Sequence, residues 1–256
     1  MTFIIAEAGG NHGGSLETAL QLVNAAKASG ADAVKFQLFE SRKLWGDDRI
    51  KGLELSRVQM SDIAAYCKAC EIEFMCTPFG VEEVQFLVPL VKRMKVASGC
   101  LARFDLLEAI SATGLPAILS TGMSTLYDIG LALGRLKLLG TTLMHCTSSY
   151  PCRLEDVNLR AMDNLRTAFS LPVGFSDHTN GITAAIAAAA KGAAIIEKHL
   201  TLDCNAEGPD HKASITPAEF KAMVMAIREV ETALGDGKKR VLDCERPLRA
   251  AWHANA

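Results

Sequence analysis

Short apolar runs and longer amphipathic stretches alternate regularly along this chain, and few folds accommodate that pattern. The apolar runs have the length of strands, and the segments between them, about one to two dozen residues each, have the period of helices. Strands that alternate with helices are typical of a parallel sheet covered by helices. The predicted strands are FIIAEAG (3–9), AVKFQLF (33–39), EFMCTPF (73–79), RMKVAS (93–98), PAILST (116–121), TTLMHCTS (141–148), PVGFSDH (172–178) and AAIIEKHL (193–200).

Eight strands, each followed by a helical segment, within 256 residues predict a fold of the α/β class, the (β/α)8 or TIM barrel. We expect one such domain over residues 1–256. The alternative is a doubly wound open sheet, which would need a glycine-rich phosphate turn after its first strand. The segment GGNHGG (9–14) is rich in glycine but lacks the GxGxxG spacing, so the barrel is favoured.

Capping residues locate several helix ends. Ser15 and Thr216 are predicted N-caps, the second with Glu219 at the capping-box position, and the helix after the fifth strand is expected to start at Ser124. Gly30 is expected to end the first helix. The last segment, VLDCERPLRAAWHANA, is interpreted as the final turn of the barrel.

Composition excludes several classes of protein. A formal net charge of -2 gives no basic surface for nucleic acid or anionic membranes, and no apolar run reaches the roughly 18 residues of a membrane span. Eight cysteines scattered through a long chain are read as reduced thiols of a cytoplasmic protein. The pair in CKAC (67–70) lies in a helical pattern and has no second CxxC, which favours a helix over a zinc or redox site.

Polar side chains collect near the ends of the predicted strands. In a (β/α)8 barrel the carboxyl ends of the strands face the active-site mouth. A single buried histidine is usually a hydrogen-bonded core residue, but a convergence of lysines, glutamates and histidines needs a ligand or reaction to compensate its charges. The polar residues are Glu7, Asn11, His12, Lys35, Gln37, Thr77, Lys95, Ser98, Ser120, Thr121, His145, Thr147, Ser148, Ser149, Ser176, His178, Glu197 and His199.

These residue types divide by chemical role. Lys35 and Lys95, with nearby serine hydroxyls, suit an anionic phosphate or carboxylate; those serines are Ser98, Ser120, Ser148 and Ser176. His178 and His199 lie on neighbouring predicted strands and could share a divalent metal, with Mn, Fe, Co or Zn favoured over Ca. Glu7 and Glu197 could act as acid, base or orienting groups.

The chain resembles the sialic acid synthase (N-acetylneuraminate synthase) family in long motifs that run in order over about residues 4 to 215. The motifs are IIAEAGGNHGGS, GADAVKFQ, CTPF, KVASG, ILSTGMST, HCTSSYP, EDVNLRAM, VGFSDHT, GAAIIEKHLTLD and EGPDHKAS. The resemblance implies a phosphoenolpyruvate-dependent synthase that condenses phosphoenolpyruvate with an open-chain aldose such as N-acetylmannosamine. The products would be a 2-keto-3-deoxy sugar acid and phosphate.

The resemblance also implies roles for individual residues. Glu7, Lys35 and Glu197 would be catalytic, and His178 and His199 would hold Mn²⁺ or Mg²⁺, with Co²⁺ as a further option. Tyr150, Glu197 and Asp210 would contact or orient the acceptor sugar. The phosphoenolpyruvate site would consist of Lys35, Gln37, Lys95, Ser98, Ser148 and Ser176, beside Ser120.

Two departures from the family pattern keep alternatives open. The family carries an acidic residue where KVASGC has Cys100, and the small C-terminal antifreeze-like domain of most members, which reaches a partner's acceptor site, is not in this sequence. A homodimer or a partner subunit therefore stays open. So do a catalytically altered sugar- or phosphate-binding relative and an aldolase with a Schiff base on Lys35 or Lys95.

Overall fold

The computed structural model describes residues 1–137 and 140–253, and it contains one eight-stranded sheet. All eight predicted strands are confirmed, with somewhat shorter bounds than the apolar runs suggested. The strands are β1 (Phe3–Glu7), β2 (Ala33–Leu38), β3 (Glu73–Pro78), β4 (Met94–Val96), β5 (Ala117–Ser120), β6 (Thr142–His145), β7 (Val173–Asp177) and β8 (Ile195–His199).

The sheet closes into a barrel rather than lying open. Its hydrogen-bonded order is β3-β2-β1-β8-β7-β6-β5-β4, and every ladder is parallel. The two strands at the ends of this order, β3 and β4, pack against each other and complete the ring. The (β/α)8 barrel is therefore confirmed, and the doubly wound open sheet is wrong.

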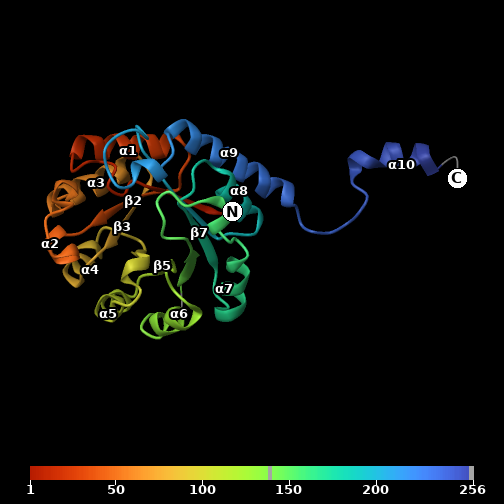
Figure 1. The fold of residues 1–256 in the computed structure, drawn as a ribbon. Coiled ribbons are helices and arrows are strands. Elements are labelled where there is room, and N and C mark those ends of the chain that lie inside the picture. Colours follow the sequence, from red (N-terminus) through yellow and green to blue (C-terminus); the bar gives the residue numbers. More distant parts are fainter. Residues whose placement is uncertain (138–139, 254–256) are drawn as a thin grey trace.

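Helices surround the barrel (Figure 1). Within residues 1–137 and 140–253, no helix combines the length and the apolar character that crossing a membrane requires. The α-helices are α1 (Leu16–Ala28), α2 (Ser41–Trp45), α3 (Arg57–Ala69), α4 (Val81–Leu87), α5 (Phe104–Thr113), α6 (Leu126–Leu133), α7 (Ala161–Phe169), α8 (Thr183–Ala190), α9 (Pro217–Leu234) and α10 (Arg246–His253). Short 3-10 helices are η1 (Lys51–Leu53), η2 (Ser98–Cys100), η3 (Leu154–Asp156), η4 (His211–Ala213) and η5 (Asp243–Glu245).

Side-chain caps set where the predicted helices begin. Ser15 caps α1 by accepting a hydrogen bond from Thr18 N, and Thr216 forms a capping box with Glu219 at the start of α9, as predicted. The predicted start of α6 at Ser124 is one residue early, because Thr125 is the N-cap. Gly30, at φ +83°, directly follows the C-cap of α1.

The CKAC segment is helical, as predicted. Cys67 lies within α3 and Cys70 is its C-cap, and both are free thiols. Burial raises the pKa of the Cys67 thiol to about 12. A thiol this hard to deprotonate is a poor nucleophile and metal ligand, which supports a structural role for Cys67.

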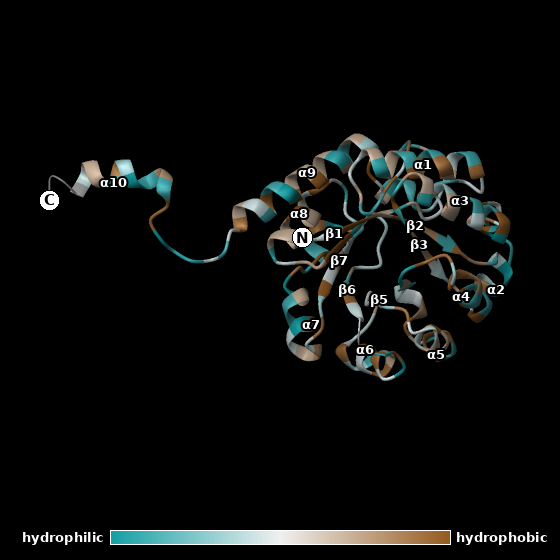
Figure 2. Cartoon of the chain, turned by 180° about the vertical axis from the view of Figure 1, so that it is seen from behind, coloured by the Kyte–Doolittle hydropathy of each residue, from teal (hydrophilic) through white to brown (hydrophobic). Residues whose placement is uncertain are grey.

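The apolar core has two parts, one between the sheet and the helices and one inside the barrel. The outer part joins the faces of the helices to outward side chains of the strands, such as Phe36 and Phe175. Figure 2 shows many brown residues on the central strands and helices around them that carry both teal and brown residues. The inner part is a separate cluster of Ile5, Ala33, Met75, Ile118, Met144 and Ile195.

The start of β1 and the last turns of α9 are tied together at the floor of the barrel, the end opposite the carboxyl ends of the strands. Thr2 N donates a hydrogen bond to Glu231, and Arg228 Nη1 donates to Thr2 O at 2.8 Å. Arg228 also pairs with Asp32 at 3.1 Å, and Asp32 accepts from Ile4 N. These contacts hold the first strand beside the last helix of the ring.

The segment after Gly237 does not form the last turn of the barrel, so that expectation is wrong. Residues 238–252 are all exposed, and Figure 1 shows α10 standing away from the barrel at the end of an extended connection. Leu248 and Trp252, four residues apart on α10, are 64% and 74% exposed. The sequence analysis did not predict the helix α10 in this segment.

Candidate active site

The polar pocket begins one layer above the apolar cluster inside the barrel. Side chains alternate in direction along a strand, so the residue two positions after each inward apolar residue also points inward. Each strand contributes one side chain at this level, and together they line a cavity of about 60 Å³. The eight residues are Glu7, Lys35, Thr77, Lys95, Ser120, Cys146, Ser176 and Glu197.

A further layer lies at the rim of the same pocket. It contains Gln37, Ala97, His178 and His199, each two residues beyond a member of the layer below, with Ser98 and Tyr150 beside them. Two serine hydroxyls lie close to the backbone of Gly122, next to this pocket. A Cβ there would lie 2.3 Å from Ser148 Oγ and 2.9 Å from Ser98 Oγ. The missing side chain therefore lets these two serines converge.

Ion pairs occupy the centre of the pocket. Lys35 Nζ lies 2.6 Å from Glu7 and 3.5 Å from Glu197, and Lys95 Nζ lies 3.4 Å from Glu197. All four side chains are at most 4% exposed. Two ammonium groups and two carboxylates thus balance their charges in a space from which water is largely excluded.

Neutral side chains complete the hydrogen bonding of these charged groups, as donors to the carboxylates and as acceptors from the lysines. Gln37 Nε2 donates to Glu7 at 2.8 Å, and Ser176 Oγ donates to Glu197 at 2.9 Å. Lys95 Nζ donates to Ser120 Oγ at 2.7 Å and Lys35 Nζ to Thr77 Oγ1 at 3.1 Å. These bonds fix the direction of each charged group.

The charged groups differ in their proton affinity because their neighbours differ. Burial alone would lower the pKa of Lys35, but Glu197 and Glu7 outweigh burial and raise it to about 12. Burial lowers the pKa of Lys95, and Glu197 offsets only part of that effect. Burial raises the pKa of Glu7, whereas Lys35 and Lys95 overcome burial and lower the pKa of Glu197. Glu7 is therefore the carboxyl suited to exchange a proton, and Glu197 stays ionised.

His178 and His199 lie side by side at the rim, with ring centroids 5.6 Å apart. His178 Nδ1 is 2.8 Å from the carbonyl oxygen of Thr147. A carbonyl can only accept, so Nδ1 carries the hydrogen and Nε2 keeps its lone pair. Burial lowers the pKa of His178 to about 3, so its ring is neutral at pH 7. His199 Nδ1 is buried and has no hydrogen-bond partner among the described residues.

Tyr150 packs against both histidines, and Asp210 lies near His199. The Tyr150 ring is 4.1 Å from the His178 ring and 5.8 Å from the His199 ring. Burial raises the pKa of the Tyr150 phenol, which keeps its hydroxyl proton available for donation. Asp210 accepts a hydrogen bond from Gly10 N at 2.8 Å, and a Cβ on Gly9 would touch both Asp210 and His199. The residues to which the family resemblance gives a role thus lie at the carboxyl ends of the strands or in the loops that follow them, although Ser148 and Asp210 do not line the pocket itself.

Cys146 is a pocket residue that the sequence analysis missed, and His145 is one that it misplaced. His145 faces the helix layer, where it stacks on Phe175 at 5.9 Å and its Nε2 contacts the carbonyl oxygen of Val157. Cys146 faces the pocket, with Sγ 3.2 Å from Ser98 Oγ. Counting in twos from an inward Met144 would have identified Cys146.

Cys100, at the family's acidic position, lies in the outer apolar core and is only 3% exposed. Burial raises the pKa of its thiol, which keeps it uncharged. η2, the short 3-10 turn that ends at Cys100, begins at Ser98, which does line the pocket. This turn therefore delivers a hydroxyl but no carboxylate.

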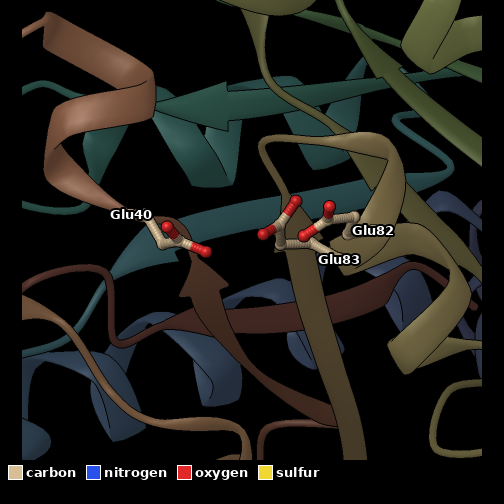
Figure 3. Close-up of side chains that lie close together, drawn as sticks. All are labelled: Glu40, Glu82 and Glu83. Carbon is tan, nitrogen blue, oxygen red and sulfur yellow. The ribbon is translucent and has the colours of Figure 1, made fainter.

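A second group of carboxylates, Glu40, Glu82 and Glu83, lies outside this pocket, beyond β2 and β3 (Figure 3). Lys43 Nζ already lies 2.9 Å from Glu40 and 3.2 Å from Glu82, and Arg57 is within 4.0 Å of Glu83. Because Lys43 and Arg57 already pair with these three carboxylates, the cluster does not indicate a metal centre.

The largest cavity described lies away from this chemistry. It has a volume of about 830 Å³ and lies at the floor, beside Phe3, Phe74 and Leu90. No histidine or cysteine lines it. The converging lysines, carboxylates and imidazoles make the smaller pocket at the carboxyl ends of the strands the candidate active site.

Comparison with known proteins gives consistent matches over almost the whole chain. A relative of 42% identity is the N,N'-diacetyllegionaminic acid synthase of Legionella pneumophila, aligned over 97% of this chain and 77% of the relative. The human N-acetylneuraminate-9-phosphate synthase is 36% identical, over 95% of this chain and 74% of the relative.

Solved structures agree with the sequence matches. The N-acetylneuraminic acid (sialic acid) synthetase of Leptospira borgpetersenii superposes with a TM-score of 0.92 at 34% identity, covering 100% of this chain and 92% of that one. A truncated 3-deoxy-D-arabino-heptulosonate 7-phosphate synthase from Thermotoga maritima, 17% identical with a TM-score of 0.75, shares the fold. The sequence profile of the NeuB family matches residues 22–239. The chain therefore belongs to the NeuB family and is an enzyme.

Proposed function

We propose that the enzyme condenses phosphoenolpyruvate with an open-chain aldose of the N-acetylmannosamine type, giving a 2-keto-3-deoxy sugar acid and phosphate. One observation carries the proposal: two buried lysines lie among serine hydroxyls, directly below the two imidazoles of His178 and His199. The layer of lysines and serines suits a phosphorylated acid, and the layer of histidines at the rim suits a carbonyl acceptor. The names of the relatives, which are synthases of legionaminic acid and of N-acetylneuraminate 9-phosphate, support this reaction class.

Phosphoenolpyruvate would bind on the side of the pocket formed by β4, β5 and the loop after β6. There Lys95 contacts Ser120, and Ser98 and Ser148 converge at Gly122. An ammonium group and several hydroxyls bind phosphate by charge-assisted hydrogen bonds. Lys35, Gln37 and Ser176 would hold the rest of the molecule from the opposite strands, where they now bond to Glu7 and Glu197.

His178 and His199 fit a divalent metal. The Nε2 lone pair of His178 points away from its hydrogen-bonded Nδ1, and His199 Nδ1 is buried without a partner in the described chain. A metal binds the neutral imidazole, and the lowered pKa of His178 keeps its ring in that form. Imidazole ligands suit Mn²⁺ or Co²⁺, and Mg²⁺ is the other candidate. Such a metal would act as a Lewis acid toward the sugar aldehyde.

The chain's own residues account for orientation and proton transfer. C3 of the enol forms a bond to the aldehyde carbon, whose oxygen takes a proton from Glu7. Water then adds at C2 and gives one proton to Glu7, which is now ionised. Phosphate leaves with cleavage of the C–O bond as the C2 hydroxyl becomes the keto group and passes its proton to the departing phosphate. Lys35 and Lys95 hold the departing phosphate's charge, and Tyr150, Glu197 and Asp210 orient the acceptor.

The test is phosphate release from phosphoenolpyruvate with Mn²⁺, over N-acetylmannosamine, related amino sugars, neutral hexoses, pentoses and short aldehydes, with and without EDTA. We expect release that requires both an amino sugar and the metal. If phosphate is released at the same rate with and without an acceptor sugar, the condensation reaction is contradicted. If phosphoenolpyruvate binds but no acceptor releases phosphate, the non-catalytic binding relative, acting with a partner, would be the better description.

A Schiff-base aldolase is a second candidate because burial lowers the pKa of Lys95, which favours a nucleophilic amine. Its contact with ionised Glu197 at 3.4 Å opposes that role by holding the proton. Borohydride reduction in the presence of pyruvate separates the two reactions. The synthase gives no trapped adduct, whereas a stable adduct on Lys95 or Lys35 would establish the aldolase.

A further inference from the structure

An ion pair lies directly behind the site, on the outer face of the same two strands that carry the histidines. Asp177 of β7 and Lys198 of β8 are register partners, and their charged atoms are 3.0 Å apart. Both side chains are 0% exposed. Because directions alternate along a strand, these two side chains point outward while their neighbours Ser176 and Glu197 bond to each other inside the barrel.

The pair is bonded to the backbone of the residue that follows His178. Thr179 N donates to Asp177 Oδ1 at 2.8 Å, and Thr179 O accepts from Lys198 Nζ. Both backbone groups of Thr179 are therefore held by the pair. One carboxylate and one ammonium together anchor the chain just after the histidine.

His178 itself is bonded on its other sides. Its carbonyl oxygen accepts from Cys152 N at 2.8 Å, and its ring nitrogen Nδ1 donates to Thr147 O at 2.8 Å. On the ring itself, Nε2 lies 3.3 Å from Ser176 Oγ, and Tyr150 packs on one face. The ion pair adds a restraint on the backbone, from the strand that carries His199. It thereby joins the two histidine-bearing strands at the height of the rings.

Stability alone does not account for this ion pair. Removing two charges from water carries a large desolvation cost, and apolar side chains of similar volume often stabilise such a position equally well or better. A salt bridge with directed hydrogen bonds does supply a fixed geometry, which apolar packing does not. Asp177 and Lys198 make these bonds to the backbone beside a site residue.

We propose that Asp177 and Lys198 are positioning residues, which hold the His178 ring beside that of His199 with its Nε2 directed into the pocket, 3.3 Å from Ser176 Oγ. This inference rests on the proposed role of the two histidines as metal ligands. Neither residue lines the pocket, so both act through His178 rather than on a substrate.

The main test is the double variant Asp177→Asn/Lys198→Met, which removes both charges at nearly constant volume and leaves Asn Oδ1 able to accept from Thr179 N. We expect Mn²⁺ affinity, measured by electron paramagnetic resonance, to fall about 10- to 100-fold, the usual effect of losing a group that orients a ligand. Phosphoenolpyruvate affinity, which depends on Lys95, should change by less than about 2-fold. The single variant Lys198→Met would leave a buried unpaired carboxylate and is expected to fold poorly.

The matched control is Glu73→Gln/Arg93→Met. Glu73 and Arg93 form a partly buried ion pair at 2.8 Å, at the floor of the barrel and far from the histidines. Removing it also deletes an ion pair between neighbouring strands, but it should leave Mn²⁺ affinity unchanged. A merely structural role for Asp177 and Lys198 predicts that both double variants behave alike, and that result would overturn the proposal.

A second readout needs no metal. In the apo protein, ¹⁵N resonances of the imidazole report which nitrogen carries the hydrogen, and His178 should show the Nδ1–H form alone. The test variant should lose that single form, and the control should keep it. If the parent protein binds no Mn²⁺, the proposed metal function fails, while an unchanged His178 resonance in the test variant would separately refute the positioning role.

Discussion

Lys35 and Lys95 occupy the same layer of the barrel, yet their proton affinities change in opposite directions. Lys35 lies between two carboxylates, whereas Lys95 contacts one carboxylate and the hydroxyl of Ser120. Lys35 is therefore locked in its charged form, and Lys95 has more capacity to accept a new anion. The side of the pocket near Lys95 is the better place for a phosphate.

Replacing Lys95 with methionine should weaken phosphoenolpyruvate binding. A charge-assisted hydrogen bond contributes about 1.5–3 kcal/mol, so the KM for phosphoenolpyruvate should rise roughly 10- to 100-fold. Steady-state kinetics with varied phosphoenolpyruvate measure the effect. Lys92→Met, at an exposed lysine on the floor, is the control. A KM that stays at the parent value would remove Lys95 from the phosphate site.

His12 should make the protein less stable in mild acid. Its side chain is 2% exposed, Nδ1 accepts from Gly14 N, and burial lowers its pKa from 6.5 to about 4. Between these values the unfolded chain binds a proton that the folded chain does not. The free energy of unfolding therefore falls as pH drops from 6.5 to 4, by up to roughly 3 kcal/mol.

Urea unfolding at pH 7 and pH 4.5 checks this behaviour of His12. In His12→Gln, the loss of unfolding free energy between the two pH values should be smaller than in the parent protein. Glutamine can still accept from Gly14 N and does not titrate. An equal loss in both proteins would show that other groups dominate the acid response.

Strand periodicity accounts for most of what could be predicted about the site. Once β1, β2 and β8 are placed, counting in twos puts Glu7, Lys35 and Glu197 in one layer. The prediction failed on β6, where the polar His145 seemed a better site residue than Cys146. Polarity is a poor guide there, because His145 satisfies its ring nitrogen on a backbone carbonyl outside the barrel.

The outward-facing partners could not be predicted in the same way. In the triplets SDH and EKH, Asp177 and Lys198 each lie between two residues that point into the barrel. The sequence alone does not show which side chains these two charged residues contact. Their pairing depends on the register of β7 against β8, which sets Asp177 opposite Lys198. Register is a property of the assembled sheet. Likewise, burial of Cys100 follows from how η2 packs on the core.

At Gly174 of β7 there is no room for a side chain between β7 and β8. A Cβ at this position would lie 2.6 Å from Ile195 O and 2.9 Å from Ile195 Cβ. Gly174→Ala should therefore lower the free energy of unfolding by about 1–3 kcal/mol, the usual cost of overpacking. Urea unfolding measures the change. Gly52→Ala, where no atom lies within 4 Å, is the control, and equal stability of the two variants would contradict the predicted crowding.

The barrel could be predicted from the alternation of strands and helices in the sequence, whereas the position of the segment after Gly237 could not. Eight parallel strands with intervening helices leave few alternatives, because right-handed crossovers and covered sheet faces exclude most topologies. The segment after Gly237 has helical periodicity, and its apolar face requires burial by something. Periodicity carries no information about the distance between a helix and the rest of the chain.

Truncation after Gly237 should leave the barrel's stability unchanged. Residues 238–252 are exposed, and Arg240 and Lys238 bond locally to Asp236. Removal of exposed residues usually changes stability by less than about 0.5 kcal/mol, or roughly 2 °C in melting temperature for a chain of this size. Differential scanning calorimetry of the two proteins gives the comparison. A fall of about 5 °C or more would mean that the tail packs on the barrel in solution.

The contacts of Arg228 and Glu231 with Thr2 bring the two ends of the ring together at the floor. The site residues all come from the opposite end, on strand termini and the loops that follow them. Because these two ends lie side by side, the chain could be joined between Thr2 and Glu231. New ends could then be made at the exposed turn around Gly114. Such a circular permutant should keep every site residue in place, so the order in which this ring is synthesised is separable from the chemistry that it supports.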